Sequence, residues 1–345
     1  MLRLKLPQES LSSSTWRQVW IVLLGSLVML LILNLVTIWY LGNLTTNFGY
    51  WTIHQKWYLL EDLDAPVDWL ILGDSSCNQG VMPVIFMAEL GETAVNLCTI
   101  GNLGTVDDLW MLEEYIDRHG PPQHVLIVHV YDIWHRPLDP VIIGQVPRFW
   151  GFWNQHTFGA DFFSIPGVKE ETFLERYVPL YSQTRTLTNI LRTTLMLQHN
   201  PFKPAWHLEP DGFLVATEPK VDTVINGTQD HIRFSSENSF SVSSSNDQAM
   251  QEIVELADQY GIDIYLVNAP VYQGLYDDPA YQSYLNDVQN KLAEFASDSP
   301  YVYHIDAVRA FPAELMQTPD HLILPGAEAY THWVIEQISL LGSQE

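Results

Sequence analysis

The chain has 345 residues, 47% of them hydrophobic, and a formal net charge of −25. An apolar content this high, without a long low-complexity tract, excludes an intrinsically disordered chain and allows one large folded domain or two small ones. The strong negative charge argues against a nucleic-acid partner, because the phosphates would repel it.

An apolar segment near the N-terminus predicts a membrane anchor. Positions 18–55 contain no Lys, Arg, Asp or Glu, and residues 19–41 form a nearly unbroken apolar run. As a helix this run is about 34 Å long, enough to cross the hydrocarbon core of the lipid bilayer. Trp20 at one end and Trp39 with Tyr40 at the other are placed for the two aromatic belts. A cleaved signal peptide is the alternative, but its apolar core would be shorter and would end at a small-residue site.

Basic residues beside the anchor predict its orientation. Arg3, Lys5 and Arg17 precede it, and positive residues mark the cytoplasmic side of a membrane segment. We therefore expect residues 1–18 in the cytoplasm, a single pass through the cell membrane, and an extracytoplasmic body after a connector at 42–66. Three of the 16 basic and one of the 41 acidic residues lie in the first 41 positions, which leaves a charge of −27 on the remainder.

From residue 67 onward, apolar runs of strand length alternate with helical stretches. This alternation predicts an α/β domain over 67–345, with a doubly wound parallel sheet of about five strands between helix layers. The interval 135–245 fits no such unit and predicts an inserted cap or subdomain. A capping box over 105–108 opens the second helix. The expected strands are 67–72, 94–97, 124–130, 262–267 and 301–305, and the expected helices follow the first strand to 90 and then cover 105–119, 245–260, 280–295 and 325–341.

Two features leave alternatives open. Seven aromatic residues lie within 148–163, and they suit a sugar-stacking platform, a membrane-facing patch or the core of the insertion itself. Cys77 and Cys98 follow predicted strand ends. An exported compartment permits a disulfide, but two buried free cysteines are the favoured expectation.

The turn after the first strand offers a candidate nucleophile. Gly73-Asp74-Ser75 ends this strand and opens a helix, so Ser75 lies at the carboxyl edge of the sheet, where open α/β sheets form their sites. A serine there can attack an ester while backbone amides hold the oxyanion. The same residues also suit a plain helix cap at Ser75 or Ser76, so the motif needs partners elsewhere in the chain.

Those partners occur before the last helix. Asp320-His321 lies between the fifth strand and the closing helix, at the same sheet edge as Ser75. A nucleophilic serine needs a base, and the base needs an orienting acid. This predicts His321 as the base and Asp320 as the acid, with Asp306 as an alternative acid. The histidine spacings predict no metal site, and we expect no cofactor, because no complete dinucleotide fingerprint occurs.

Together, these motifs resemble the SGNH (GDSL-type) hydrolase superfamily over about residues 67–133 and 250–341. The resemblance implies a flavodoxin-like three-layer sheet, with Ser75 as nucleophile and His321 as base. It also implies an oxyanion glycine after the second strand, which falls on Gly101 and would act with the amide of Ser75. By the same resemblance, the residues expected to contact substrate are Ser76, Asn102, Tyr131 and Asp132.

Two positions depart from the pattern of that superfamily. Its third block is Gly-x-Asn-Asp, but the chain has His129-Val130-Tyr131-Asp132, so Tyr131 stands where an asparagine would donate to the oxyanion. Its acid lies three residues before the histidine, where the chain has Thr318. The predicted anchor and exported body are similar to the branch that works beside membrane-bound O-acyltransferases in decorating cell-surface polymers.

These expectations define a function. We expect a serine esterase or O-acyltransferase that acts on acyl esters of an extracytoplasmic glycan or lipid-linked polymer through an acyl-serine intermediate. A multi-span membrane O-acyltransferase is the expected protein partner. The alternative, favoured by Tyr131, is a catalytically weak SGNH-like domain that serves such an acyltransferase as partner or scaffold.

Overall fold

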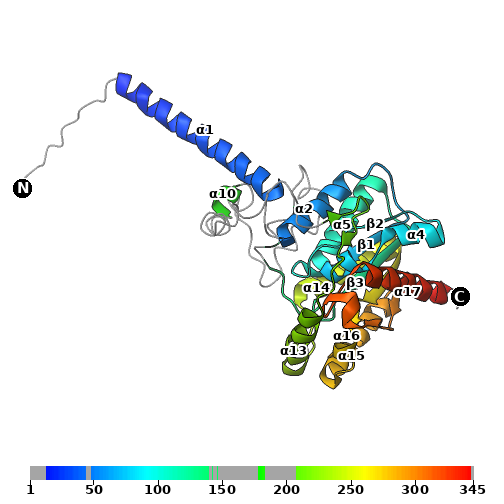
Figure 1. The fold of residues 1–345 in the computed structure, drawn as a ribbon. Helices are drawn as coiled ribbons and strands as arrows, with labels where there is room; N and C mark the ends of the chain where they lie inside the picture. Colours follow the sequence, from blue (N-terminus) through cyan, green and yellow to red (C-terminus); the bar gives the residue numbers. More distant parts are fainter. Residues whose placement is uncertain are drawn as a thin grey trace, which may run out of the picture. The chain divides into compact units, whose positions relative to one another are not determined.

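The chain forms two compact units (Figure 1). The computed structural model describes residues 13–43, 48–139, 142, 146, 178–182 and 207–342. The aromatic-rich stretch 148–163 lies outside the described residues. The first unit comprises Met1–Thr46 and Glu171–Phe202, and the second comprises Asn47–Glu170 and Lys203–Glu345.

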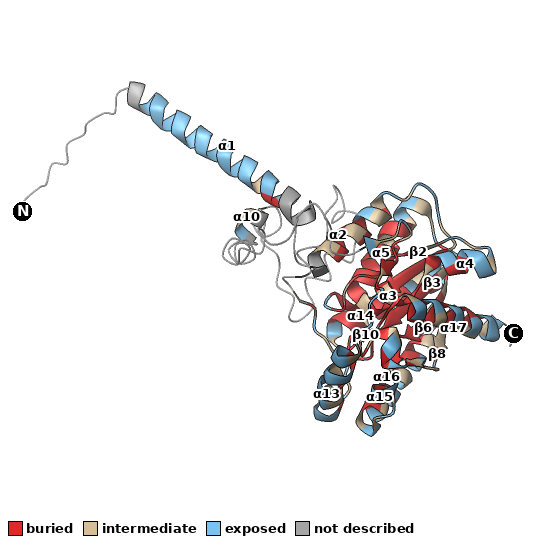
Figure 2. Ribbon diagram, in the orientation of Figure 1, coloured by how far each residue is buried: buried red, intermediate tan, exposed pale blue. Residues whose placement is uncertain are grey.

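The first unit contains one long apolar helix. α1 (Ser13–Asn43) extends beyond the predicted run at both ends, and its segment Trp16–Ile38 is long and apolar enough to cross a membrane. Most side chains of this segment are exposed, as Figure 2 shows in pale blue. The short helix α10 (Pro179–Ser182) belongs to the same unit, and its Leu180 amide donates to the side chain of Asn34 over 3.2 Å. Within the described residues, the structure thus confirms one helix near the N-terminus that is long and apolar enough to cross a membrane.

The second unit is built on a five-stranded parallel sheet. All five predicted strands are present, and their bounds differ from the predicted ones by at most two residues. Leu70 of the first strand lies opposite Val95 on one side and Val125 on the other, which fixes the register. The strands follow the order β2 (Ala94–Asn96), β1 (Trp69–Gly73), β3 (His124–His129), β6 (Asp263–Asn268) and β8 (Val302–Ile305).

Helices cover this sheet, and both of its faces are buried. Every residue of β1 is buried, and successive side chains of a strand point to opposite faces, so both faces must be covered. Figure 2 shows the strands in red and the outer faces of the helices in pale blue. The α/β class is confirmed. In one group α14 (Ser244–Tyr260) contacts α5 (Gly104–His119) and α16 (Pro279–Ser297). In the other, α17 (Leu324–Gly342) contacts α3 (Ser75–Gly80) and α4 (Pro83–Leu90).

Two helix predictions are corrected. The stretch expected as one helix from residue 75 to Leu90 is two helices, because Pro83 begins α4 and the amide of Met82 donates to the hydroxyl of Thr331 over 3.0 Å. The predicted capping box is also wrong. α5 begins at Gly104, and the hydroxyl of Thr105 donates instead to the carbonyl of Asn246 over 3.0 Å, a contact between helices that a local motif cannot predict.

The segment expected as a connector contains a helix of the second unit. α2 (Phe48–Glu61) buries Trp57 and also the whole of Lys56. The Lys56 ammonium donates to the Asn96 carbonyl over 2.8 Å and to the Gly212 carbonyl. Burial lowers the pKa of Lys56 well below its ordinary value. These bonds fix α2 to the carboxyl end of β2.

Short elements complete the second unit. Within the described part of 135–245 they include α13, which packs against α16 and the hairpin formed by β10 and β11. The bounds are β4 (His207–Leu208), β5 (Leu214–Val215), α13 (Val221–Glu237), β7 (Val271–Tyr272), α15 (Gln273–Tyr276), β9 (Ala310–Phe311), the 3₁₀ helix η1 (Ala313–Leu315), β10 (Met316–Thr318) and β11 (His321–Leu322).

Candidate active site

The end of β1 places Ser75 at the carboxyl edge of the sheet. Gly73 has a φ of 140°, and a Cβ there would lie 2.0 Å from a carbonyl oxygen of β3, so the position requires glycine. Asp74 then caps α3, because its carboxylate accepts from the amides of Ser76 at 2.8 Å and Val130 at 2.7 Å. These bonds tie the turn to the segment after β3. Ser75 is half-buried and is the first residue of α3.

A buried ion network adjoins this turn. The imidazole of His129, the last residue of β3, lies 2.6 Å from Asp108 and 3.5 Å from Asp74, and all three side chains are almost inaccessible. Burial alone would lower the pKa of His129, but the two carboxylates outweigh it and raise this pKa to about 10. Burial would likewise raise the pKa of Asp74, and His129 with the two amides lowers it. The charged histidine therefore holds Asp74, and Asp74 holds the turn.

A tight hairpin brings Asp320 and His321 together. β10 and β11 are joined by a turn at Pro319 and Asp320, and the Asp320 carboxylate lies 2.8 Å from Nδ1 of His321. The hydroxyl of Thr318 donates to the same carboxylate over 2.6 Å and lies 2.7 Å from Nδ1. Burial alone would raise the pKa of Asp320 and lower that of His321. Their attraction reverses both, so the pKa of the acid falls and that of the histidine rises.

The hairpin packs against the helix that carries Ser75. β11 begins with His321 and contacts α3, which begins with Ser75. Burial and Asp320 have the largest effects on the pKa of His321, and the charge of Asp74 raises this pKa further. Because Nδ1 is held by Asp320, Nε2 is the ring nitrogen left to exchange a proton. The two halves of the predicted site thus meet at one edge of the sheet.

The loop after β3 adds an arginine to this edge. Nη2 of Arg136 lies 2.6 Å from Oδ2 of Asp132. Nη1 of Arg136 lies 2.9 Å from the point that a Cβ on Gly101 would occupy, so Gly101 is a glycine because side chains of this loop lie against its Cα. Burial would lower the pKa of Arg136, but Asp132, Asp74 and Asp320 raise it. The guanidinium is therefore charged, paired with Asp132 and within electrostatic range of Asp74 and Asp320.

The residues expected to contact substrate differ in exposure. Asn102 is exposed beside Gly101. Asp132 is nearly buried, and its Oδ1 has no hydrogen bond to any residue that the structure describes. Ser76 is 0% exposed, so its hydroxyl lies away from the surface. The reason is local, because a helix that begins at Ser75 turns the next side chain inward.

Tyr131, which the sequence predicts to contact substrate, belongs to an aromatic cluster beside α13. The residue is 3% exposed, and its hydroxyl lies 3.0 Å from Nδ1 of His231 on α13. Its ring makes edge contacts with Phe234, Tyr281 and Tyr284. Burial raises the pKa of Tyr131 above its ordinary value. The phenol is thus bound to α13.

Cys77 and Cys98 form a disulfide, so the expectation of two free thiols is wrong. Cys77 lies in α3 after β1, and Cys98 follows β2, its parallel neighbour. Their Cα atoms are 5.8 Å apart, within the usual range for a disulfide. Only the pairing of β1 with β2 creates this proximity, and sequence spacing does not report it. The bond joins α3 to the segment that leads to Gly101.

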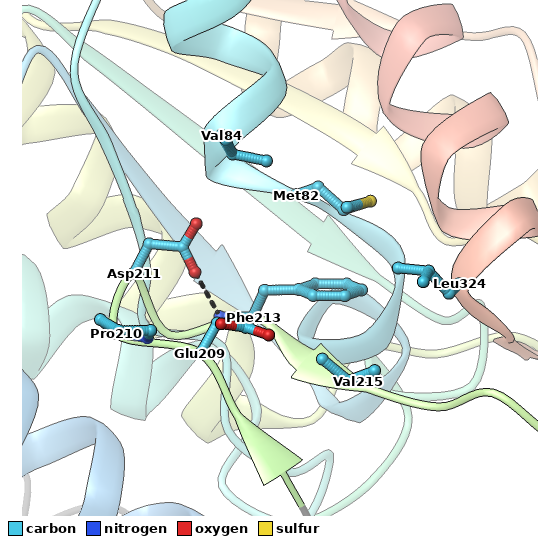
Figure 3. Close-up of a pocket in the computed structure, with 8 residues that line it drawn as sticks. All are labelled: Met82, Val84, Glu209, Pro210, Asp211, Phe213, Val215 and Leu324. Atoms are coloured by element: carbon cyan, nitrogen blue, oxygen red, sulfur yellow. Dashed lines mark hydrogen bonds between the residues drawn. The ribbon is translucent and has the colours of Figure 1, made fainter.

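A cavity of about 400 Å³ adjoins the same elements (Figure 3). Met82 follows α3, and Leu324 begins α17 three residues after His321. Ser75 and His321 are not among the described residues that line it, so this cavity is a neighbour of the candidate site. Its walls are mostly apolar, with two carboxylates, and consist of Met82, Val84, Glu209, Pro210, Asp211, Phe213, Val215 and Leu324.

The sequence predicts no metal site and offers Asp306 as an alternative acid. Among the described residues, no group of three or more His, Cys, Asp or Glu is placed to hold a metal ion. Asp306 is exposed and follows β8, which β6 and β3 separate from β1 in the sheet. Asp320 is therefore the carboxylate that contacts His321.

Three features of the site were missed at the sequence level. The residues around Asp108 fit a capping box, so no local pattern marks Asp108 as the partner of His129. Thr318 was noted only as the place where an acid is absent, although its hydroxyl bonds Asp320. Arg136 carries no sequence signal, because only the fold brings it to Gly101. No protein-family model matches the chain, and no curated protein matches it by sequence.

Proposed function

We propose that the chain is a membrane-anchored serine esterase or O-acyltransferase that acts on acyl esters of an extracytoplasmic glycan or lipid-linked polymer. One observation carries the proposal: Asp320 lies 2.8 Å from Nδ1 of His321 in a hairpin that packs against the helix beginning with Ser75. The strand order β2-β1-β3-β6-β8 supports a flavodoxin-like arrangement of the SGNH type, in which sites form at the carboxyl ends of the strands.

The chemistry follows the serine, histidine and aspartate pattern. Oγ of Ser75 attacks the ester carbonyl carbon while its proton passes to Nε2 of His321. The ester bond between the carbonyl carbon and the alcohol oxygen then breaks. The leaving alcohol takes the proton from His321, and Ser75 carries the acyl group. Water or a glycan hydroxyl attacks the acyl-serine in the same way and frees Ser75. Asp320 orients the imidazole and stabilises its positive charge, and the amides of Ser75 and Gly101 are the backbone donors to the oxyanion.

Two features support an exported body. Arg3, Lys5 and Arg17 precede the apolar helix, which favours a cytoplasmic N-terminus. The Cys77–Cys98 disulfide is of the kind that persists in oxidising compartments outside the cytoplasm. Both suit an enzyme whose substrate is a polymer of the cell surface.

The second candidate function is a catalytically weak SGNH-like partner or scaffold of a multi-span membrane O-acyltransferase. Tyr131 favours it, since its hydroxyl is bound to His231 where the superfamily has an oxyanion donor. On this hypothesis the body docks on the acyltransferase, and Ser75 is dispensable.

Kinetics of two adjacent serine variants test the proposal. The full-length chain in detergent should hydrolyse a neutral aryl acetate, and Ser75→Ala should lower kcat/KM by about 10³-fold or more. Ser76→Ala is the matched control, because its buried hydroxyl has no hydrogen-bond partner among the described residues and its loss breaks no bond there. Equal activity of Ser75→Ala and wild type would reject the catalytic proposal and favour the scaffold.

A further inference from the structure

We infer that Arg136 is a catalytic residue whose guanidinium stabilises the oxyanion, in the place where Tyr131 offers no free donor. This inference rests on the proposed function, because it requires an acyl-serine reaction in which negative charge develops on the carbonyl oxygen. It assigns a side-chain donor to a site for which only the backbone amides of Ser75 and Gly101 had been considered.

The position of the guanidinium beside Gly101 carries the inference first. Nη1 of Arg136 lies 2.9 Å from the point that a Cβ on Gly101 would occupy. The segment before Gly101 runs beside the nucleophile turn, since the amide of Thr99 donates to the carbonyl of Gly73 over 2.9 Å. The disulfide of Cys98 to α3 holds the same segment. The guanidinium therefore lies beside Gly101, in the segment between β2 and α5 that is bonded to Gly73 and to α3.

The surrounding charges point to the same place. Arg136 acts electrostatically on His321, and Asp74 and Asp320 act on Arg136, so the guanidinium is within range of both halves of the site. Asp132 fixes the guanidinium through Nη2 at 2.6 Å. A guanidinium has five N–H donors, so this bond leaves donors for a second acceptor. The side chain is 38% exposed, which keeps those donors open to a bound ester.

The chemistry suits an arginine. Its charge does not depend on pH in the range where His321 works as a base. A neutral ester gives the guanidinium little to bind in the ground state, whereas the tetrahedral intermediate carries a full negative charge. The interaction is thus stronger in the transition state, and its loss should lower kcat and leave KM almost unchanged.

The test uses the full-length chain in detergent and a neutral aryl acetate. Arg136→Ala should lower kcat by about 10²–10³-fold, as loss of one oxyanion donor does. Millimolar guanidinium ion should restore part of this kcat, and Arg136→Lys should be intermediate. The matched control is Arg118→Ala, which removes an arginine that pairs with Glu114 at 2.5 Å at the far end of α5, and it should retain wild-type kcat.

A structural role of Arg136 gives different results. The double variant Asp132→Asn/Arg136→Ala removes both partners of the ion pair and leaves no carboxylate at position 132. It should therefore unfold at the wild-type temperature, and its kcat should stay as low as that of Arg136→Ala. Wild-type kcat in Arg136→Ala, or a loss confined to KM, would overturn the inference while leaving Ser75-dependent turnover intact. Absence of Ser75-dependent turnover in the wild-type chain would instead reject the proposed function, and the inference with it.

Discussion

At the scale of residues, the pKa of His321 determines how the activity depends on pH. A base must be neutral to accept a proton, and Asp320 raises the pKa of His321 above the ordinary value. The rising limb of kcat/KM should therefore lie above about pH 6.5, the usual pKa of histidine. Asp320→Asn removes the attracting charge, so the limb should move to lower pH while the maximal rate falls by up to about 10⁴-fold.

The control for this pH profile is Asp306→Asn, because Asp306 is exposed and follows a strand two places from β3 in the sheet order. It should leave both the limb and the maximum as in wild type. Loss of turnover in Asp306→Asn together with normal turnover in Asp320→Asn would refute the assignment of Asp320 as the acid that orients His321. Equal tolerance of both variants would indicate a serine and histidine dyad.

Residues that belong to a local sequence motif could be identified as candidates from the sequence. Ser75 follows an apolar strand, and His321 stands beside Asp320 before the last helix, so topology alone places them at one sheet edge. Arg136 and His129 could not be predicted, since the first meets Gly101 and the second meets Asp74 only through tertiary contacts. The roles of Ser75, His321 and Asp320 remain predictions until the variants are measured.

At the scale of elements, the junction of β3 with α3 depends on His129. Its pKa is about 10 in the folded chain and about 6.5 in the unfolded chain, so folding favours the protonated form. The stability that it contributes is complete below pH 6.5 and is lost as pH rises toward 10, with a slope of up to about 1.4 kcal/mol per pH unit. Asp107, whose pKa burial raises to about 7, adds to the fall only at the lower end of this window, and it does so in wild type and variant alike.

The measurement is the thermal unfolding midpoint of the full-length chain from pH 6 to 10. The wild-type midpoint should fall between pH 6 and 10. The midpoint of His129→Gln should be lower than that of wild type at pH 6 and should change less across the range. The midpoint at pH 6 is lower because the variant leaves Asp74 and Asp108 as buried carboxylates without their cation. Parallel curves for the two chains would contradict a charged histidine at this junction.

Elements with a strong apolar pattern were predicted well, and elements set by tertiary contacts were not. β1 is buried on both faces and therefore has a continuous apolar sequence. By contrast, α2 buries Lys56, a residue type usually found in solvent. Only the tertiary fold supplies the carbonyls of Asn96 and Gly212 that accept hydrogen bonds from it. In an extended chain the side chains of Asp320 and His321 would point to opposite sides. The turn at Pro319 and Asp320 lets these two neighbours contact each other.

At the scale of the whole molecule, one apolar helix and one α/β body account for the described residues. The helix is long and apolar enough to span a bilayer, and three basic residues precede it. Residues 42–345 carry a net charge of −27, and a net charge this far from zero keeps protein surfaces from associating. Which side the body occupies is a property that the anchor sequence predicts and that labelling from outside can measure.

The most direct test is therefore labelling of spheroplasts that express the full-length chain with a membrane-impermeant fluorophosphonate, followed by peptide mapping. We predict one adduct, on Ser75, with no need to open the cells, and no adduct in Ser75→Ala or after prior treatment of the outer face with protease. Adduct formation only after lysis would contradict the extracytoplasmic body. Absence of an adduct on Ser75 before and after lysis would contradict the central claim that Ser75 is an activated nucleophile.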